Sequence, residues 1–255
     1  MFKRTGVLFA VCAIAVCVFA GDVWKDKDYK QWDEKDVQKI LFDSPWAKSA
    51  SVARAWGGAG MTGGDDEGGF SLPRGGTPDS IGSSGGRGGR GGDDTLNGAG
   101  APRPSAATFL VRWVSAHTIR EAIARDGELH GAKPEAAEKF LDAQITQYAI
   151  LVGGTDLRPF GKADDEVLAA LKQAAYLEPQ KSKQRIAPSK VGVQRDPKTQ
   201  RLLAVIFEFD RKTPAGEPVI AAGEKEIQFT CVYNKLSLKQ KFDLTKMTDK
   251  QGLDL

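Results

Sequence analysis

Residues 227–244 have the sequence Ile-Gln-Phe-Thr-Cys-Val-Tyr-Asn-Lys-Leu-Ser-Leu-Lys-Gln-Lys-Phe-Asp-Leu. Apolar and polar residues alternate on both sides of Asn234-Lys235, which is the pattern of two half-buried strands joined by a short turn. A second pair of apolar runs, at 191–193 and 202–209, flanks Asp196-Pro197-Lys198, and this sequence favours a turn. The end of the chain is therefore predicted to form antiparallel β-hairpins.

Helical patterns lie upstream of these hairpins. Thr118 and Glu121 have the spacing of a capping box ahead of an apolar stripe. Pro134 is typical of the first turn of a further helix. The acidic run Asp164-Asp165-Glu166 is typical of another, because carboxylates are favoured where the helix dipole is positive. A helix is therefore expected to begin near each of these positions.

The order of the elements decides the fold class. Apolar runs at 108–114 and 148–152 predict buried strands among the helices, and the hairpins follow them. Helices early and antiparallel hairpins late indicate an α+β fold rather than a doubly wound parallel sheet. We assign this single α+β domain to residues 106–255.

Residues 21–56 are predicted to form a helical aromatic arm ahead of the domain. Asp33 is a suitable N-cap for a first helix, and Ser44-Pro45 can end that helix and open a second, short one. The arm is expected to dock on the domain. The alternative is an exposed aromatic surface for a partner or a glycan, and its candidate partner-binding residues are Trp24, Trp32 and Trp46.

Residues 57–105 hold more than half of the 29 glycines of the chain. Such a composition cannot bury enough apolar area to offset the entropy of ordering the backbone, so a disordered Gly-rich linker is predicted. Two RGG repeats at 86–92 resemble RNA-binding sequences, but no aromatic residue is interleaved and Asp93-Asp94 follows them. Nucleic-acid binding is not expected.

Residues 1–20 have the layout of a Sec-type signal peptide. Lys3 and Arg4 precede an unbroken apolar run at 7–20, and cleavage is expected after Ala20. The run is shorter than the roughly 20 residues that a membrane-spanning helix needs. The protein is therefore expected to be periplasmic or secreted, with no transmembrane segment after cleavage.

Charge and cysteine content exclude several classes of protein. The chain has 36 basic and 33 acidic residues, and so close a balance gives no general attraction to nucleic acid or anionic lipid. Removal of the leader leaves Cys231 as the one cysteine, so no internal disulfide is expected. Cys231 alternates with apolar residues and is predicted to be a buried thiol. No cofactor motif is found outside chance matches in the glycine tract.

Two hypotheses about function remain open. The first, which we favour, is a non-enzymatic extracytoplasmic binding or scaffold module whose partner is another extracytoplasmic protein or a component of the cell envelope. The second is a hydrolase-like enzyme with a site assembled around His117 or His130, the only histidines. Ser115, or an acidic residue of 164–166, would complete such a site. The histidine spacing offers no zinc set, so no metal is expected.

Several stretches resemble small exported proteins predicted in Acidobacteria, which are described as uncharacterised. The stretches are Gln31-Trp-Asp-Glu-Lys-Asp-Val-Gln-Lys-Ile-Leu-Phe-Asp-Ser-Pro-Trp-Ala47, residues 108–115, Ile186-Ala-Pro188, Lys239-Gln-Lys-Phe242 and Gly252-Leu-Asp-Leu255. The resemblance implies an exported location and a similar architecture. It assigns no functional residue, because that group has no settled activity.

Overall fold

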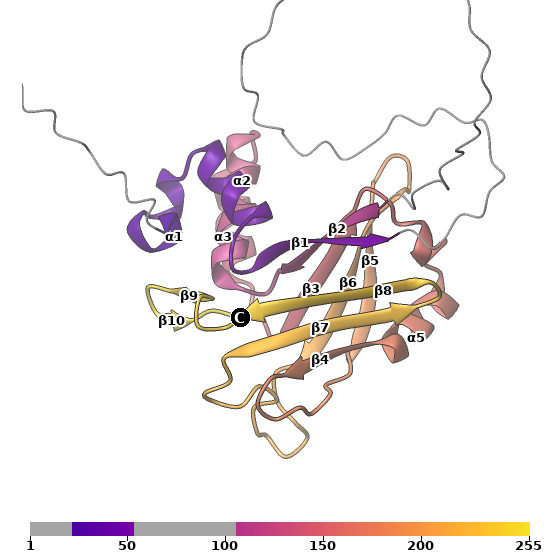
Figure 1. Ribbon diagram of the computed structural model, residues 1–255. Coiled ribbons are helices and arrows are strands. Elements are labelled where there is room, and N and C mark those ends of the chain that lie inside the picture. The colour runs from indigo at the N-terminus through magenta and orange to yellow at the C-terminus, as the bar shows by residue number, and fades with distance from the viewer. Residues whose placement is uncertain (1–21, 54–105) are drawn as a thin grey trace, which may run out of the picture.

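The computed structural model describes residues 22–53 and 106–255 (Figure 1). The expected signal peptide (1–20) and the whole of the expected linker (57–105) lie outside the described residues. The described chain is an α+β domain with helices early and antiparallel strands late, as the sequence predicts. Among the described residues, no helix combines the length and the apolar character needed to cross a membrane.

The helices are α1 (Val23–Asp26), α2 (Glu34–Phe42), α3 (His117–Leu129), α4 (Pro134–Asp142) and α5 (Asp165–Ala174), with short 3-10 turns at Tyr29–Gln31 and Arg158–Phe160. The strands are β1 (Ala47–Ala53), β2 (Ala106–Trp113), β3 (Gln147–Gly154), β4 (Ala175–Pro179), β5 (Lys190–Arg195), β6 (Leu202–Asp210), β7 (Glu226–Tyr233), β8 (Leu236–Asp243), β9 (Thr248–Asp249) and β10 (Gly252–Leu253).

Two antiparallel sheets enclose the core. The first has five strands in the order β1-β2-β3-β6-β5, and the second has three in the order β4-β7-β8. The three-stranded sheet lies across the five-stranded one (Figure 1). Aromatic rings meet between them: Trp113 contacts Phe242 at 5.5 Å between centroids, and Phe207 contacts Phe229 at 5.2 Å. Burial of these apolar faces is the main stabilising contribution to the fold.

Both predicted hairpins are confirmed. Strands β7 and β8 pair directly around Asn234, which adopts a positive φ of 51° that asparagine tolerates better than most residues. Strands β5 and β6 pair on either side of the Asp196 turn. Cys231 is fully buried in β7, and burial raises the pKa of its thiol to about 12, which makes it an inert core residue.

The first segment is integrated into the domain. Asp33 caps α2 as predicted, and its side chain accepts a hydrogen bond from the backbone N–H of Asp36 at 2.8 Å. The prediction of a second short helix after Ser44-Pro45 is wrong. The Ser44 hydroxyl instead donates to the carbonyl of Ile40 at 2.7 Å, and the chain turns into β1, which pairs with β2 along its whole length at the edge of the sheet.

The three candidate partner-binding tryptophans are in the core. Trp24, Trp32 and Trp46 are 6%, 1% and 0% exposed. Trp24 and Trp46 meet edge to face at 5.3 Å, and the Trp46 indole N–H donates to the backbone oxygen of Asp254 at 2.7 Å. The arm therefore packs on the domain, and these tryptophans are buried within it rather than displayed on an open surface.

Candidate ligand-binding groove

Two adjoining hollows surround His117. The larger has a volume of about 270 Å³ and the smaller about 130 Å³, and they share His117, Asp249 and Gln251. We call them together the His117 groove. The larger hollow is lined by Ser115, His117, Arg120, Ile145, Arg211, Asp249, Gln251, Leu253, Asp254 and Leu255, and the smaller by Trp24, Lys27, Asp28, Tyr29, His117, Glu121, Asp249, Lys250 and Gln251.

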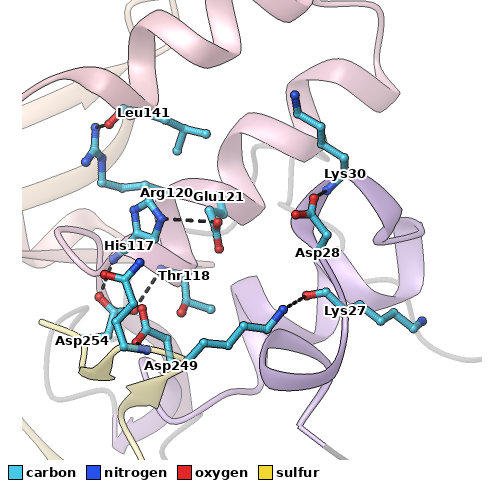
Figure 2. A network of polar contacts seen from close by, with 12 residues as sticks. Lys27, Asp28, Lys30, His117, Thr118, Arg120, Glu121, Leu141, Asp249 and Asp254 are labelled. Carbon is cyan, nitrogen blue, oxygen red and sulfur yellow. Dashed lines mark hydrogen bonds and ion pairs between the residues drawn. The ribbon is translucent and has the colours of Figure 1, made fainter.

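The last residues of the chain fix the N-terminus of α3 at this groove (Figure 2). The Asp254 carboxylate accepts hydrogen bonds from the backbone N–H groups of His117 at 2.5 Å and Thr118 at 2.9 Å. These groups have no partner within the helix, and the helix dipole also favours a negative charge there. The backbone N–H of Asp254 in turn donates to the carbonyl of Met247 at 2.9 Å, so the backbone that carries this carboxylate is also fixed.

The capping box predicted for Thr118 and Glu121 is wrong. The helix begins two residues earlier than a Thr118 cap would place it, at His117, and its N-cap Ala116 has no side chain that could accept a hydrogen bond. Asp254 takes over the capping role from 136 residues along the chain, a distance over which local spacing carries no information. Glu121 is left to pair with His117, one helical turn away, at 3.3 Å.

The arm closes one side of the groove. Figure 2 shows Lys27 and Asp28 of the arm opposite Glu121 and Asp249. The Lys250 ammonium group, from the turn between β9 and β10, donates to the backbone oxygen of Lys27 at 3.2 Å. Segments far apart in the sequence therefore build the groove: the arm lines the smaller hollow, Ile145 and Arg211 line the larger one, and the start of α3 and the β9–β10 hairpin line both.

His117 has a raised pKa. The main cause is its hydrogen bond to Glu121; partial burial opposes the shift, and the negative charges of Glu121, Asp254 and Asp249 add to it. Its side chain is nearly half exposed. The imidazole therefore keeps its proton to a higher pH than a free histidine does, while it faces the groove.

Replacing Glu121 by glutamine is expected to lower the pKa of His117 toward its ordinary value of 6.5, because the largest cause of the shift is lost. The Cε1–H signals of the two histidines, followed by NMR as a function of pH, measure this change. His130, whose pKa is raised by the backbone oxygen and charge of Asp126, is the internal control and should keep its titration curve. An unchanged His117 curve would show that Glu121 does not hold the proton.

The sign of the effect on stability follows from this shift. The folded-state pKa of His117 lies above the unfolded value, so the pairing stabilises the fold fully below the unfolded pKa and this contribution is lost as the pH rises through the folded pKa. The free energies of unfolding of wild type and Glu121→Gln should therefore differ more at about pH 5.5 than at about pH 8.

Two arginines line the larger hollow. Arg120 donates through Nη2 to the backbone oxygens of Phe140, of Leu141 at 3.0 Å and of Ala143 at 3.1 Å, which are terminal carbonyls of α4 and the loop after it. Burial lowers its pKa. Arg211 donates through Nη2 to the backbone oxygen of Leu255, and its guanidinium lies 4.6 Å from the centroid of the Tyr148 ring.

The residues proposed for a hydrolase do not assemble into one. Ser115 lines the larger hollow, but its hydroxyl accepts from the backbone N–H of Ala149 at 3.1 Å, and in the described chain no hydrogen bond joins it to His117. Asp164 caps α5 by accepting from Val167 at 3.1 Å, and neither it nor its acidic neighbours line either hollow. His130 is exposed beyond the end of α3, beside the backbone oxygen of Asp126 at 2.8 Å.

The groove therefore combines fixed hydrogen-bonding and charged groups without a paired nucleophile and base. Within residues 22–53 and 106–255, no group of three or more His, Cys, Asp or Glu side chains is placed to hold a metal ion. Comparison with known proteins adds no further assignment: no family model, no curated protein and no solved structure matches the chain.

Proposed function

We propose that the protein is an extracytoplasmic binding module and that the His117 groove is its binding site. The observation that carries the proposal is the convergence on one hollow of polar side chains from the start of α3, from Arg211 and from residues 249–254, with the histidine paired with Glu121 and not with Ser115. Fixed polar groups in a concave site orient a ligand, whereas hydrolysis by a serine needs a base within reach of its hydroxyl.

The walls of the groove support a rigid site. Its floor includes the capped start of α3, and the capping carboxylate belongs to Asp254, whose backbone oxygen is bound by the buried Trp46. A ligand would meet groups that are already held in place, which reduces the entropy cost of binding. The proposed location outside the cytoplasm rests on the signal peptide expected at 1–20.

The two histidines make the test direct, because His117 lines the groove and His130 lies beyond the other end of the same helix. The purified protein is titrated with short-chain carboxylates, amines, neutral sugars and inorganic phosphate while both Cε1–H signals are recorded. A saturable shift of His117 with His130 unmoved supports the proposal. If no compound moves His117 alone, the groove is not the binding site.

The same samples separate binding from catalysis. Conversion of a bound compound, lost in Ser115→Ala, would favour the hydrolase alternative. The N-terminal residue of the protein recovered from outside the cytoplasm tests the location: Gly21 is expected after cleavage, and an intact Met1 would contradict it.

A further inference from the structure

We propose that the larger hollow of the His117 groove binds a single neutral sugar ring, with its hydroxyl groups on Asp249, Gln251 and Arg211 and its C–H face on Leu253. This inference rests on the proposed function and names the chemical class of its ligand. Four properties of the hollow carry it: the balance of its charges, its unused hydrogen-bonding groups, its apolar rim and its volume.

Charges of both signs line the hollow. They belong to two arginines and two aspartates, Arg120, Arg211, Asp249 and Asp254. An oxygen of Leu255 also accepts from Arg211, and His117 is paired with Glu121. A charged ligand would be attracted to one set of these groups and repelled by the other, and it would also lose its hydration on entry. The hollow therefore favours a ligand without net charge.

Some polar groups of the hollow are not used by the fold. Asp249 accepts through Oδ1 from the backbone N–H groups of Gln251 at 2.7 Å and Gly252 at 3.0 Å, and its Oδ2 accepts no hydrogen bond within the described residues. The side-chain amide of Gln251 is exposed and makes no hydrogen bond in that part of the chain either. Arg211 donates through Nη2, which leaves Nη1 as a donor.

Hydroxyl groups match this mixture of donors and acceptors. A hydroxyl both donates and accepts, so neighbouring hydroxyls on one ring can use a carboxylate, an amide and a guanidinium at once. Hydrogen bonds to an ionised group are stronger than neutral ones, and here the charge is on the protein alone. The turn holds Asp249, and the Tyr148 ring lies 4.6 Å from the guanidinium of Arg211, so both groups are positioned before a ligand binds.

The rim and the volume select one sugar ring. Ile145 is 37% and Leu253 57% exposed, and both line the hollow. They offer an apolar surface to the C–H face of a ring whose hydroxyls point the other way, because burying such a face removes apolar area from water. A volume of about 270 Å³ lies near the lower end of ligand pockets and suits a single ring rather than a chain.

The probes are the methyl glycosides of glucose, galactose and mannose, followed by the His117 Cε1–H signal. At least one is expected to shift this signal saturably while His130 stays unmoved. The controls have the same ring with a charge: the methyl glycoside of glucuronate, and that of glucosamine at a pH below the pKa of its amine. Both should bind about tenfold or more weakly than the best neutral glycoside. Failure of all three neutral glycosides, or equal or tighter binding of a charged control, would overturn the inference.

Gln251→Ala is expected to weaken binding of the best glycoside about fivefold, the loss of one hydrogen bond. Gln180→Ala is the matched control, because Gln180 is also an exposed glutamine in a turn, after β4, and lines neither hollow. Its affinity should equal that of the wild type. Thermal unfolding of both variants verifies that they are folded. A folded Gln251→Ala protein that binds as tightly as the wild type would contradict the placement of the ring.

A free sugar and the terminal ring of a glycan share this chemistry. A disaccharide that ends in the preferred ring distinguishes them: tighter binding than the methyl glycoside assigns a glycan end, and weaker binding assigns a free sugar. The outcomes also separate this inference from the proposed function. If every neutral glycoside fails while a carboxylate, an amine or phosphate moves His117 alone, the ligand class is wrong and the groove remains the binding site. If nothing moves His117, both proposals fail.

Discussion

The Trp46→Ala variant should lose about 4 kcal/mol of its free energy of unfolding, within the range measured when a buried tryptophan is truncated. Trp46 is fully buried, meets Trp24 edge to face, and connects the arm to the last residues of the chain through its indole N–H. Alanine leaves a large cavity and also removes the donor to the backbone oxygen of Asp254. Urea unfolding monitored by circular dichroism measures the change.

Trp46→Phe removes the N–H donor but only part of the ring volume. A smaller loss than with alanine is therefore expected, about 2 kcal/mol. A Trp46→Ala protein within about 1 kcal/mol of the wild type would contradict the placement of the arm in the core.

Replacing Asp254 by alanine is expected to cost about 2 kcal/mol, the upper end of the range for helix caps. The carboxylate binds two backbone N–H groups of α3 and faces the positive end of its dipole. Asp254→Asn keeps an acceptor without the charge and should lie between alanine and the wild type. The same urea experiment measures all three proteins.

Asp164→Ala is the matched control for this prediction. Asp164 is also a helix N-cap, but it is exposed, local to α5 and accepts one backbone hydrogen bond. Its loss should cost about 1 kcal/mol, a typical value for a cap. If Asp254→Ala costs no more than Asp164→Ala, the long-range cap contributes nothing beyond an ordinary one. His117 gives a second readout, since its pKa should fall when the charge of Asp254 is removed.

Local patterns predicted the elements whose partners lie nearby. The β7–β8 hairpin follows from alternation around Asn234, α2 from the cap Asp33, and α5 from the acidic run at 164–166. Strand β1 was not predicted, because its sequence Ala-Lys-Ser-Ala-Ser-Val-Ala is a run of small residues in which apolar and polar side chains alternate only weakly. Its strand state is decided by pairing with β2, which follows only after residues 54–105.

The groove was predictable only in part. His117 was a candidate from the sequence, and it does line the groove, but its partner Glu121 was assigned to a capping box. One local pattern pointed to Arg120. It lies three residues before Ile123 and four before the buried Ala124, and residues at these spacings share a helix face, so a cation is placed beside the apolar side of α3. Asp254 and Arg211 had none, because their roles depend on contacts that only the folded chain creates.

The pairing of Ala53 with Ala106 has a consequence for the order of folding. The contacts of the arm with the rest of the sheet close a very long loop, and the entropy of that closure must be overcome before the contacts form. We expect the arm and β1 to join last during folding and to exchange their amide hydrogens first. Because the arm also forms one side of the His117 groove, a bound ligand would slow that exchange. The opening rate of the edge strand β1 would therefore report whether the groove is occupied.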